Sequence, residues 1–262
     1  MEYEDDSLIL LNGKITRTAP GIFFFKQDPG LSAALEFSVL QRTARPGLNT
    51  RRFHRYTGMA QNQKNTIEIM RRYVEETMDR PGSHGIDHVL RVVHLCEMIG
   101  KEEHADLDVL IPAALFHDIA RSVEEKEGIP HEIAGADHAE RYLRSIGYDE
   151  DRIPAISHAI RSHRFSTGCE PETPEAKILS DADKLDAMGA VGIARTFIRA
   201  GEHRGEIRDG VDHIHTKLLH LGGLMYTGTA GKIACDRHAF LSLFLETLDR
   251  EAALPESRRR EP

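Results

Sequence analysis

The sequence lacks most of the features that mark secreted, membrane-spanning and nucleic-acid-binding proteins. It has three cysteines and no Cys-x-x-Cys pair, and this odd count argues against a disulfide framework, so a reducing cytoplasm fits best. No apolar run is long enough to cross a bilayer, and the acidic start of the chain differs from the basic start of a secretory signal. The net charge of −8 argues against a broad nucleic-acid surface, because counterion release needs a basic face. We therefore expect a cytoplasmic protein with neither a membrane nor a nucleic-acid partner.

The motifs of several large enzyme classes are also missing. The chain contains no GxGxxG, no P-loop, no serine nucleophile elbow and no zinc pattern built on Cys-x-x-Cys. Histidine, by contrast, is abundant, and its 15 copies call for a search for metal-ligand spacing, since it is a common metal ligand and general acid or base. The negative net charge does not exclude a nucleotide substrate, because a bound cation and a few local basic residues can offset phosphate charge.

The first 58 residues differ from the rest of the chain. The apolar segment Ile22–Phe25 is strand-like, but prolines and glycines closely bracket it, and a basic stretch without apolar periodicity follows. We expect residues 1–58 to form a poorly ordered or loosely attached extension. Residues 59–255 are expected to form one domain, and residues 256–262 a charged tail.

From about residue 63 onward, apolar residues recur at helical spacing. Residues 107–119 are apolar nearly all round, which indicates a buried central helix that Pro112 bends or begins. No strand pair with a hairpin turn is evident in this part of the chain, so the expected class is all-α. The expected helices span residues 65–79, 87–100 with Asp87 as cap, 107–119, 131–146, 151–163 with Asp151 as cap, 174–187, 189–200, 210–226 and 230–252.

Two adjacent polar residues, His117 and Asp118, end the apolar central helix. An ionised aspartate that is buried without a partner is strongly unfavourable, and a divalent cation is one such partner. A histidine beside an aspartate supplies both nitrogen and oxygen ligands. Taken alone the pair is a weak signal, because a surface histidine and aspartate at a helix end are common.

A second segment contains His88 and Arg91 at positions i and i+3, so on a helix they share a face. A metal-binding histidine beside a guanidinium suits a phosphate ester, because the guanidinium can hold phosphate oxygens. The alternative is a solvated or capping histidine near the start of a helix.

A third segment places Asp181, Asp183 and Asp186 within six residues. These carboxylates repel each other unless something positive lies among them, and Lys184 offsets only part of their charge. The alternative is an acidic solvated helix face. The apolar residues between the aspartates argue against that alternative.

In their order and spacing, these segments resemble the HD-domain superfamily of metal-dependent phosphohydrolases, in particular its small stand-alone bacterial and archaeal branch. The resemblance covers roughly residues 64–252 and not residues 1–58. One departure is His84-Gly85, where members of the branch often have His-Asp, and it puts in doubt only a contact behind the metal ligands. The matching segments are His88-x-x-Arg91-Val92, the helix that ends in His117-Asp118, Asp183-Lys184-Leu185 within residues 181–197, and the closing residues 237–241.

The resemblance implies an all-α HD-domain helical bundle with a metal site in its core. The implied ligands are His88, His117, Asp118 and Asp183, and Asp183 ranks above Asp181 because the family ligand directly precedes the basic residue and leucine. The implied site is mononuclear for Mn²⁺ or Mg²⁺, with Co²⁺, Ni²⁺ and Fe²⁺ as further candidates. The implied reaction is hydrolysis of phosphate esters or anhydrides, often of nucleotides.

Three residues near the implied ligands are candidate catalytic groups. Arg91 and Lys184 are expected to stabilise the charge on the non-bridging phosphate oxygens. Asp186, one helical turn from Asp183, is a candidate for orienting or deprotonating the attacking water.

Further histidines are candidates for substrate contact or for a second metal, which some HD proteins hold. His163 continues the buried stripe of its helix and His138 lies close to the stripe of another, whereas His158 points nearly opposite. For His138 and His163 we favour substrate contact or general acid catalysis over a second metal. Both are also compatible with ordinary core histidines.

Three interpretations of function follow. The first is a phosphohydrolase that acts on a small phosphorylated substrate, with a nucleotide as the best guess. The second keeps the scaffold but makes it a di-iron oxygenase, which needs two irons per chain. The third is a non-catalytic helical module with a structural metal, and the cations Arg91 and Lys184 beside the implied ligands argue against it. A homodimer is left open.

Overall fold

A computed structural model of the chain describes residues 8–11, 14–17, 65–78, 85–164 and 169–252. These residues belong to two compact units, Met1–Gly58 and Met59–Pro262. Each unit is described by itself below.

The described part of the first unit is a pair of short strands. Strand β1 (Leu8–Leu11) pairs with β2 (Lys14–Arg17) in antiparallel register, with Leu8 opposite Arg17. Asn12-Gly13, the sequence between them, is the type of dipeptide that most strongly predicts a hairpin, so a local signal for this pairing exists. The segment Ile22–Phe25 lies outside the described residues. The expectation of a poorly ordered or loosely attached extension therefore stays a prediction.

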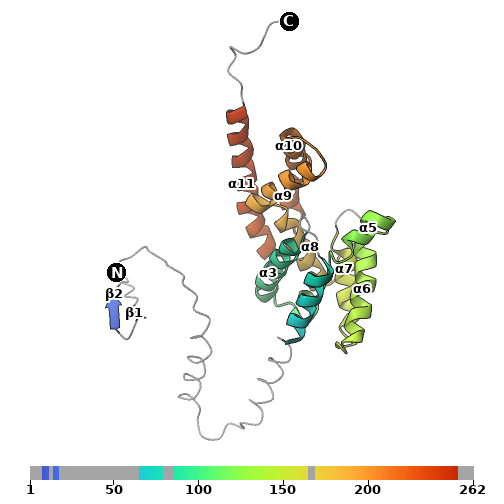
Figure 1. Ribbon diagram of the computed structural model, residues 1–262. Coiled ribbons are helices and arrows are strands. Elements are labelled where there is room, and N and C mark those ends of the chain that lie inside the picture. Colours follow the sequence, from blue (N-terminus) through green and yellow to red (C-terminus); the bar gives the residue numbers. More distant parts are fainter. Residues whose placement is uncertain (1–7, 12–13, 18–64, 79–84, 165–168, 253–262) are drawn as a thin grey trace, which may run out of the picture. The chain divides into compact units, whose positions relative to one another are not determined.

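The described regular elements of the second unit are all helical, which confirms the all-α class (Figure 1). None of these helices is long and apolar enough to cross a membrane. They are a helix over residues 65–77, α3 (Ile86–Glu102), α4 (Leu107–Phe116), α5 (Arg121–Glu127), α6 (His131–Ser145), α7 (Ile153–Ser162), α8 (Pro174–Asp186), α9 (Gly189–Glu202), α10 (Ile207–Thr216), the 3-10 helix η2 (Leu218–Leu224) and α11 (Gly228–Ala252).

Several predicted boundaries need correction. The single helix expected over residues 210–226 is two elements, because the backbone leaves the helical region at Lys217, with φ −127° and ψ −58°. Asp87 and Asp151 are not caps: Gly85 and Arg152 occupy the cap positions of α3 and α7. The central helix ends at Phe116, so His117 and Asp118 lie in the turn that follows it.

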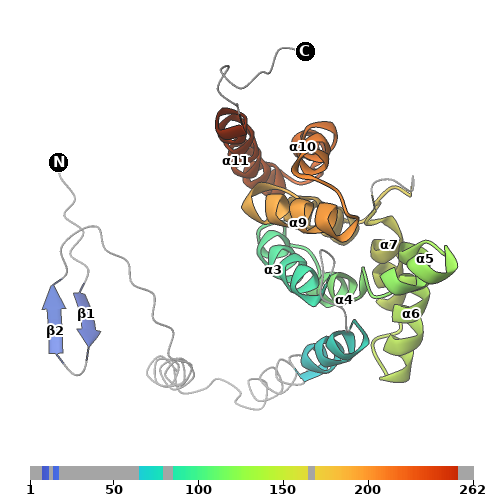
Figure 2. The ribbon, with the colours of Figure 1, turned by 45° about the horizontal axis from the view of Figure 1, so that its top comes forward.

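Helices α4 and α8 form the centre of the helical unit. Figure 2 shows α4 between α3 and α6. Every residue of α4 from Val109 to Phe116 is buried, and α4 packs against α3, α6, α7 and α8. Helix α8 begins at Pro174, and the preceding Thr173 caps it: the Thr173 hydroxyl accepts a hydrogen bond from Ala176 N. Helix α8 also contacts α9 and α11. The packing of α4 and α8 against each other and against α3 therefore brings together the three predicted site segments.

A tight connection joins α8 to α9. A Cβ atom at Gly192 would lie 2.1 Å from the carbonyl oxygen of Ala187, so only glycine permits this approach. Gly189 has a positive φ of 68°, which glycine adopts without strain. The connection places Arg195 of α9 against the C-terminal end of α8, where its Nη1 lies 2.8 Å from Asp186 Oδ2.

Pro112 lies inside α4, where it removes one helical hydrogen bond. The carbonyl that loses its helical donor belongs to Asp108, four residues earlier. The hydroxyl of Tyr148 donates to this oxygen at 2.6 Å. Burial raises the pKa of Tyr148 to about 12, so the hydroxyl keeps its proton in the physiological range. Tyr148 thus supplies the donor that proline cannot.

We predict that Tyr148→Phe lowers the free energy of unfolding by about 1–2 kcal/mol, because the Asp108 carbonyl loses its hydroxyl donor. In a Pro112→Ala background the new backbone N–H can bond the same carbonyl, so there the loss should be smaller. Urea unfolding of the four proteins of this double-mutant cycle measures the difference. Equal losses in the two backgrounds would contradict the compensation.

Candidate metal centre

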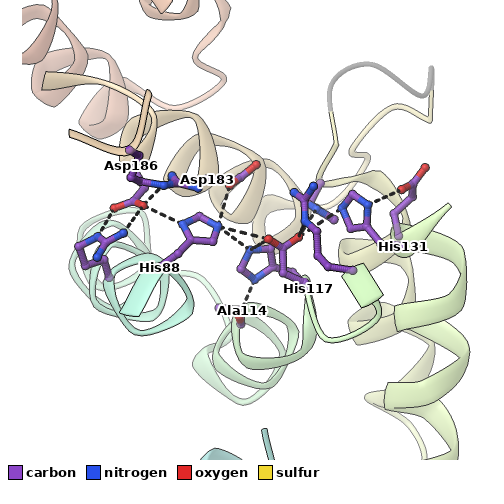
Figure 3. A network of polar contacts seen from close by, with 12 residues as sticks. His88, Ala114, His117, His131, Asp183 and Asp186 are labelled. Carbon is purple, nitrogen blue, oxygen red and sulfur yellow. Dashed lines mark hydrogen bonds and ion pairs between the residues drawn. The ribbon is translucent and has the colours of Figure 1, made fainter. Parts of the chain in front are cut away.

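Four potential metal ligands converge from three parts of the helical unit (Figure 3). His88 comes from α3, His117 and Asp118 directly follow α4, and Asp183 comes from α8. His88 Nε2 lies 3.3 Å from His117 Nε2, 3.3 Å from Asp183 Oδ1 and 3.5 Å from Asp118 Oδ2. His117 Nε2 lies 3.8 Å from the same Asp118 oxygen. We call these four residues the inner cluster.

Donor atoms of His88, His117 and Asp183 all lie within 4.8 Å of one another, close enough to hold one divalent ion, and Asp118 Oδ2 lies beside the two histidines. Four donors about 2.1 Å from a tetrahedral ion lie about 3.4 Å from one another. The donor set combines imidazole nitrogens with carboxylate oxygens, which suits first-row divalent metals. Both oxygens of Asp118 are buried and have no hydrogen-bond partner among the described residues, as expected of a carboxylate built to face a cation. Only Asp183 is partly exposed, with 26% of its side chain accessible, so the cluster opens at Asp183.

Each of the two imidazole rings of the inner cluster is oriented by a contact at Nδ1, on the side of the ring away from the cluster. His88 Nδ1 lies 2.7 Å from Asp186 Oδ2, and His117 Nδ1 lies 2.7 Å from the carbonyl oxygen of Ala114. Both partners are acceptors, so we assign a proton to Nδ1 of each ring, and Nε2 is then the nitrogen that can bind an ion once it carries no proton. This is the tautomer that a metal ligand needs.

Electrostatics in the inner cluster favour ionised carboxylates. Burial disfavours the charge of Asp183, but the hydrogen bond from His88 and the neighbouring histidines hold its pKa well below the usual value. The pKa of His117 falls to about 4, mainly because of burial. Burial also acts against protonation of His88, yet Asp118, Asp183 and Asp186 together raise its pKa to about 10. The carboxylates thus attract a positive charge to the position that His88 Nε2 faces.

A second set of donors adjoins the first, and Asp118 belongs to both. Asp118 Oδ1 lies 3.2 Å from His131 Nε2 and 3.8 Å from His163 Nε2. Asp118, His131 and His163 could also hold an ion, and we call them the outer cluster. Here too the rings are held from behind, His163 Nδ1 by the carbonyl of Ile160 at 2.6 Å and His131 Nδ1 by Glu124 at 2.5 Å.

Asp186 and Arg91, two of the predicted catalytic residues, contact each other. Arg91 donates to both oxygens of Asp186, from Nε at 2.7 Å and from Nη2 at 3.0 Å. Arg195 binds the same carboxylate, and these partners hold the pKa of Asp186 well below its usual value despite burial. Asp186 thus lies behind His88, on the Nδ1 side of the ring, and not on the side of the inner cluster.

Lys184 and Asp181 lie away from both clusters. The Lys184 ammonium is buried, donates to Ser180 Oγ at 2.8 Å and lies 4.7 Å from the Tyr226 ring centroid. Asp181 is fully buried and accepts hydrogen bonds from Tyr226 N, Thr227 N and Thr227 Oγ1 at about 2.9 Å. It therefore fixes the chain at the start of α11.

The remaining predicted histidines divide between the site and its surroundings. His163 lies in the outer cluster, as its place on the buried stripe of α7 suggested. His138 instead contacts Tyr73, with 2.6 Å between its Nε2 and the tyrosine hydroxyl. His158 accepts a hydrogen bond from Glu172 N at 3.1 Å. The structure therefore does not bring His138 or His158 to the clusters.

Sequence reasoning misses three residues around the centre: His131, Arg121 and Arg195. His131 belongs to the buried series 131, 135, 139 and 143 of α6, so extending that stripe by two steps finds it. Arg121 follows Asp118 by three residues, and its Nε lies 2.9 Å from Asp118 Oδ1. Arg195 has no local signal, because it reaches Asp186 only through the packing of α9 on α8.

Comparison with known proteins identifies related chains. Residues 85–188 match the family model of the HD domain. An uncharacterized Bacillus subtilis protein, YpgQ, is 33% identical over 194 residues, which are 70% of this chain and 92% of YpgQ. The range of the family match includes all residues of both clusters.

Solved structures agree with this relationship. The crystal structure of Bacillus subtilis YpgQ in complex with ADP has a TM-score of 0.61 and 30% identity, covering 71% of this chain and 97% of that chain. A predicted HD superfamily hydrolase from an uncultured Thermotogales bacterium has a TM-score of 0.55 and 34% identity, covering 72% and 92% of the two chains. The likeness therefore spans nearly the whole length of the two related structures and 71–72% of this chain.

We predict that Asp183→Ala removes bound metal, because one inner-cluster ligand is lost. Asp181→Ala should keep the metal but lower the free energy of unfolding by about 2–4 kcal/mol, since three donors lose their acceptor. Metal content after dialysis and urea unfolding of both variants measure these effects. If Asp181→Ala empties the site and Asp183→Ala does not, the assignment of ligands along α8 is wrong.

We predict that metal affinity rises with pH. An ion and a proton exclude each other on His88 Nε2, and with a pKa of about 10 this nitrogen is protonated at neutral pH without the ion. Binding should therefore release about one proton, and affinity should rise about tenfold per unit between about pH 6 and 8. Calorimetric Mn²⁺ titrations in buffers of different ionisation enthalpy count the proton. A pH-independent affinity without proton release would contradict this.

Proposed function

This chain belongs to the HD domain family, and we propose from that premise that it is a metal-dependent phosphohydrolase that cleaves a phosphate ester or anhydride of a nucleotide. The observation that carries the proposal is the inner cluster, in which the Nε2 atom of His88 lies within 3.5 Å of donor atoms of His117, Asp118 and Asp183. That the related YpgQ was crystallised with ADP supports a nucleotide as the substrate class.

The proposed ligands would hold a Mn²⁺ or Mg²⁺ ion, with Co²⁺, Ni²⁺ and Fe²⁺ as alternatives. Such an ion supplies a Lewis acid that lowers the pKa of water and screens phosphoryl charge. The protein's part is to keep the donors in place: Asp186 and Ala114 orient the two imidazoles. Asp183 marks the side from which a substrate reaches the centre, because the other three ligands have at most 1% of their side chains exposed.

Arg91 and His163 are proposed to act on the substrate. Arg91 uses Nε and Nη2 on Asp186, which leaves Nη1 for a phosphate oxygen, and 37% of its side chain is exposed. His163 has its Nδ1 proton held by Ile160. Burial opposes its protonation, but contact with Asp118 raises its pKa, so Nε2 can carry a proton to the leaving oxygen. The Lys184 ammonium donates to Ser180 Oγ and lies over the Tyr226 ring, away from both clusters, so Lys184 is proposed to support α8 instead.

The di-iron oxygenase is the second candidate, and the outer cluster is the observation that favours it. The inner cluster would hold one iron, and Asp118, His131 and His163 could hold a second. Iron content and oxygen consumption separate this candidate from a hydrolase. A purely structural metal is less compatible with the partial exposure of Asp183, because structural sites are closed whereas catalytic sites keep one open position.

We predict metal-dependent release of orthophosphate or pyrophosphate when the full chain is screened with Mn²⁺, Mg²⁺, Co²⁺ and Ni²⁺. The panel contains nucleoside mono-, di- and triphosphates and sugar phosphates. His117→Ala should lose both metal and turnover, because it removes a ligand that is fully buried. His215→Ala is the matched control, since His215 is exposed on α10 and belongs to neither cluster, and it should change neither quantity.

Two results would contradict the proposal. A chain that binds metal but hydrolyses nothing in the panel would support a structural ion. A chain that binds two irons and consumes oxygen would support the oxygenase.

A further inference from the structure

The carboxylate of Asp118 stands between two sets of histidines. Its Oδ2 faces His88 and His117, and its Oδ1 faces His131 and His163. On the outer side, Oδ1 and the two Nε2 atoms are buried and have no hydrogen-bond partner among the described residues. A carboxylate oxygen and two imidazole nitrogens that point at one place need a positive charge there.

That positive charge is already present in the chain, on Arg121. The Nε of Arg121 lies 2.9 Å from Asp118 Oδ1, in an ion pair without hydrogen-bond geometry, at the same oxygen that a second ion would bind. The position is built by the local fold: Arg121 N donates to the carbonyl of Asp118 at 3.1 Å, and α5 begins at Arg121. The side chain is held close to the carboxylate and is only 29% exposed.

The distribution of charge separates the two clusters. Around the outer cluster each acidic group has a guanidinium: Arg121 on Asp118, and Arg164 on Glu124 at 2.7 Å and on Glu132 at 3.4 Å. In the inner cluster, no lysine or arginine among the described residues lies within ion-pair distance of Asp183. Arg121 therefore faces the outer oxygen of Asp118, whereas no lysine or arginine among the described residues pairs with its inner oxygen or with Asp183.

We propose that the guanidinium of Arg121 takes the place of a second metal ion at the outer cluster and so limits this centre to one ion. The proposal rests on the metal site proposed above for the inner cluster. A second ion on Asp118 Oδ1 would share that oxygen with Arg121, and two positive charges in such close contact disfavour each other. The donors Asp118, His131 and His163 are present, so removal of the competing charge is sufficient for an ion to bind.

The test is the number of Mn²⁺ ions bound per chain. Arg121→Met keeps much of the side-chain length and removes its charge, and the partial exposure of Arg121 makes the variant tolerable for folding. Titration calorimetry and metal analysis after desalting should give one ion for the wild type and two for Arg121→Met. The second ion should bind at least about tenfold more tightly than in the wild type, because a competing cation is gone. Electron paramagnetic resonance should show spin coupling between two bridged Mn²⁺ ions in the variant only.

Two further variants locate the additional ion. Arg121→Met combined with His163→Ala should return to one ion, because the outer cluster then lacks a ligand. Arg161→Met makes the same change of charge on α7, where Arg161 pairs with Asp137 away from the clusters, and it should stay at one ion. Arg121→Gln is the alternative should the methionine variant fold poorly, as judged by its circular dichroism.

The other possible ion counts distinguish the role proposed for Arg121 from the metal site proposed at the inner cluster. A wild-type chain that carries two spin-coupled ions overturns the role of Arg121, as does a folded Arg121→Met or Arg121→Gln variant that still binds one. In both cases the inner metal site stands. A wild-type chain that binds no ion overturns the metal centre itself.

Discussion

The buried carboxylate of Asp118 is the constraint on which the rest of the centre depends. An ionised group without solvent access is tolerated only where positive charge or hydrogen-bond donors surround it. Four imidazole Nε2 atoms and one guanidinium face its two oxygens. The neighbouring imidazoles and Arg121 outweigh the effect of burial and keep the pKa of Asp118 far below its usual value. The charge is therefore permanent, and the surrounding helices must supply its partners.

The helices orient the four imidazole rings around Asp118 through a contact at the Nδ1 atom of each ring. The Nδ1 atoms of His88, His117, His131 and His163 each contact an oxygen acceptor, so every Nε2 is directed inward. Two of these acceptors are carbonyls three residues earlier in the same turn, which makes the orientation a product of local structure. The other two are carboxylates, and these require arginines of their own, which the chain supplies as Arg91, Arg195 and Arg164.

How far the sequence predicts this arrangement depends on the range over which each interaction acts. The long helices follow from periodicity, because α3, α4 and α8 each bury a continuous apolar face. The choice of the inner ligands, and of Asp183 over Asp181, rests instead on the resemblance to the HD-domain superfamily. Helix α5 escapes prediction since none of its residues is buried, so no apolar stripe marks it. Arg195 and the break at Lys217 depend on tertiary packing, which leaves no local pattern. His131 could have been predicted, because it continues the buried stripe of α6 that includes Ala139 and Leu143.

The proposed roles also explain why one scaffold can serve different chemistries. The donors of a second site lie where α6 and α7 pack beside the turn after α4. In this chain a positive charge already faces the outer oxygen of Asp118. A guanidinium there is fixed, cannot exchange electrons and offers no open coordination position, which suits hydrolysis at a single ion. A redox metal at the same place would make the pair competent for oxygen chemistry, so in this chain the side chain three residues after Asp118 favours the hydrolase.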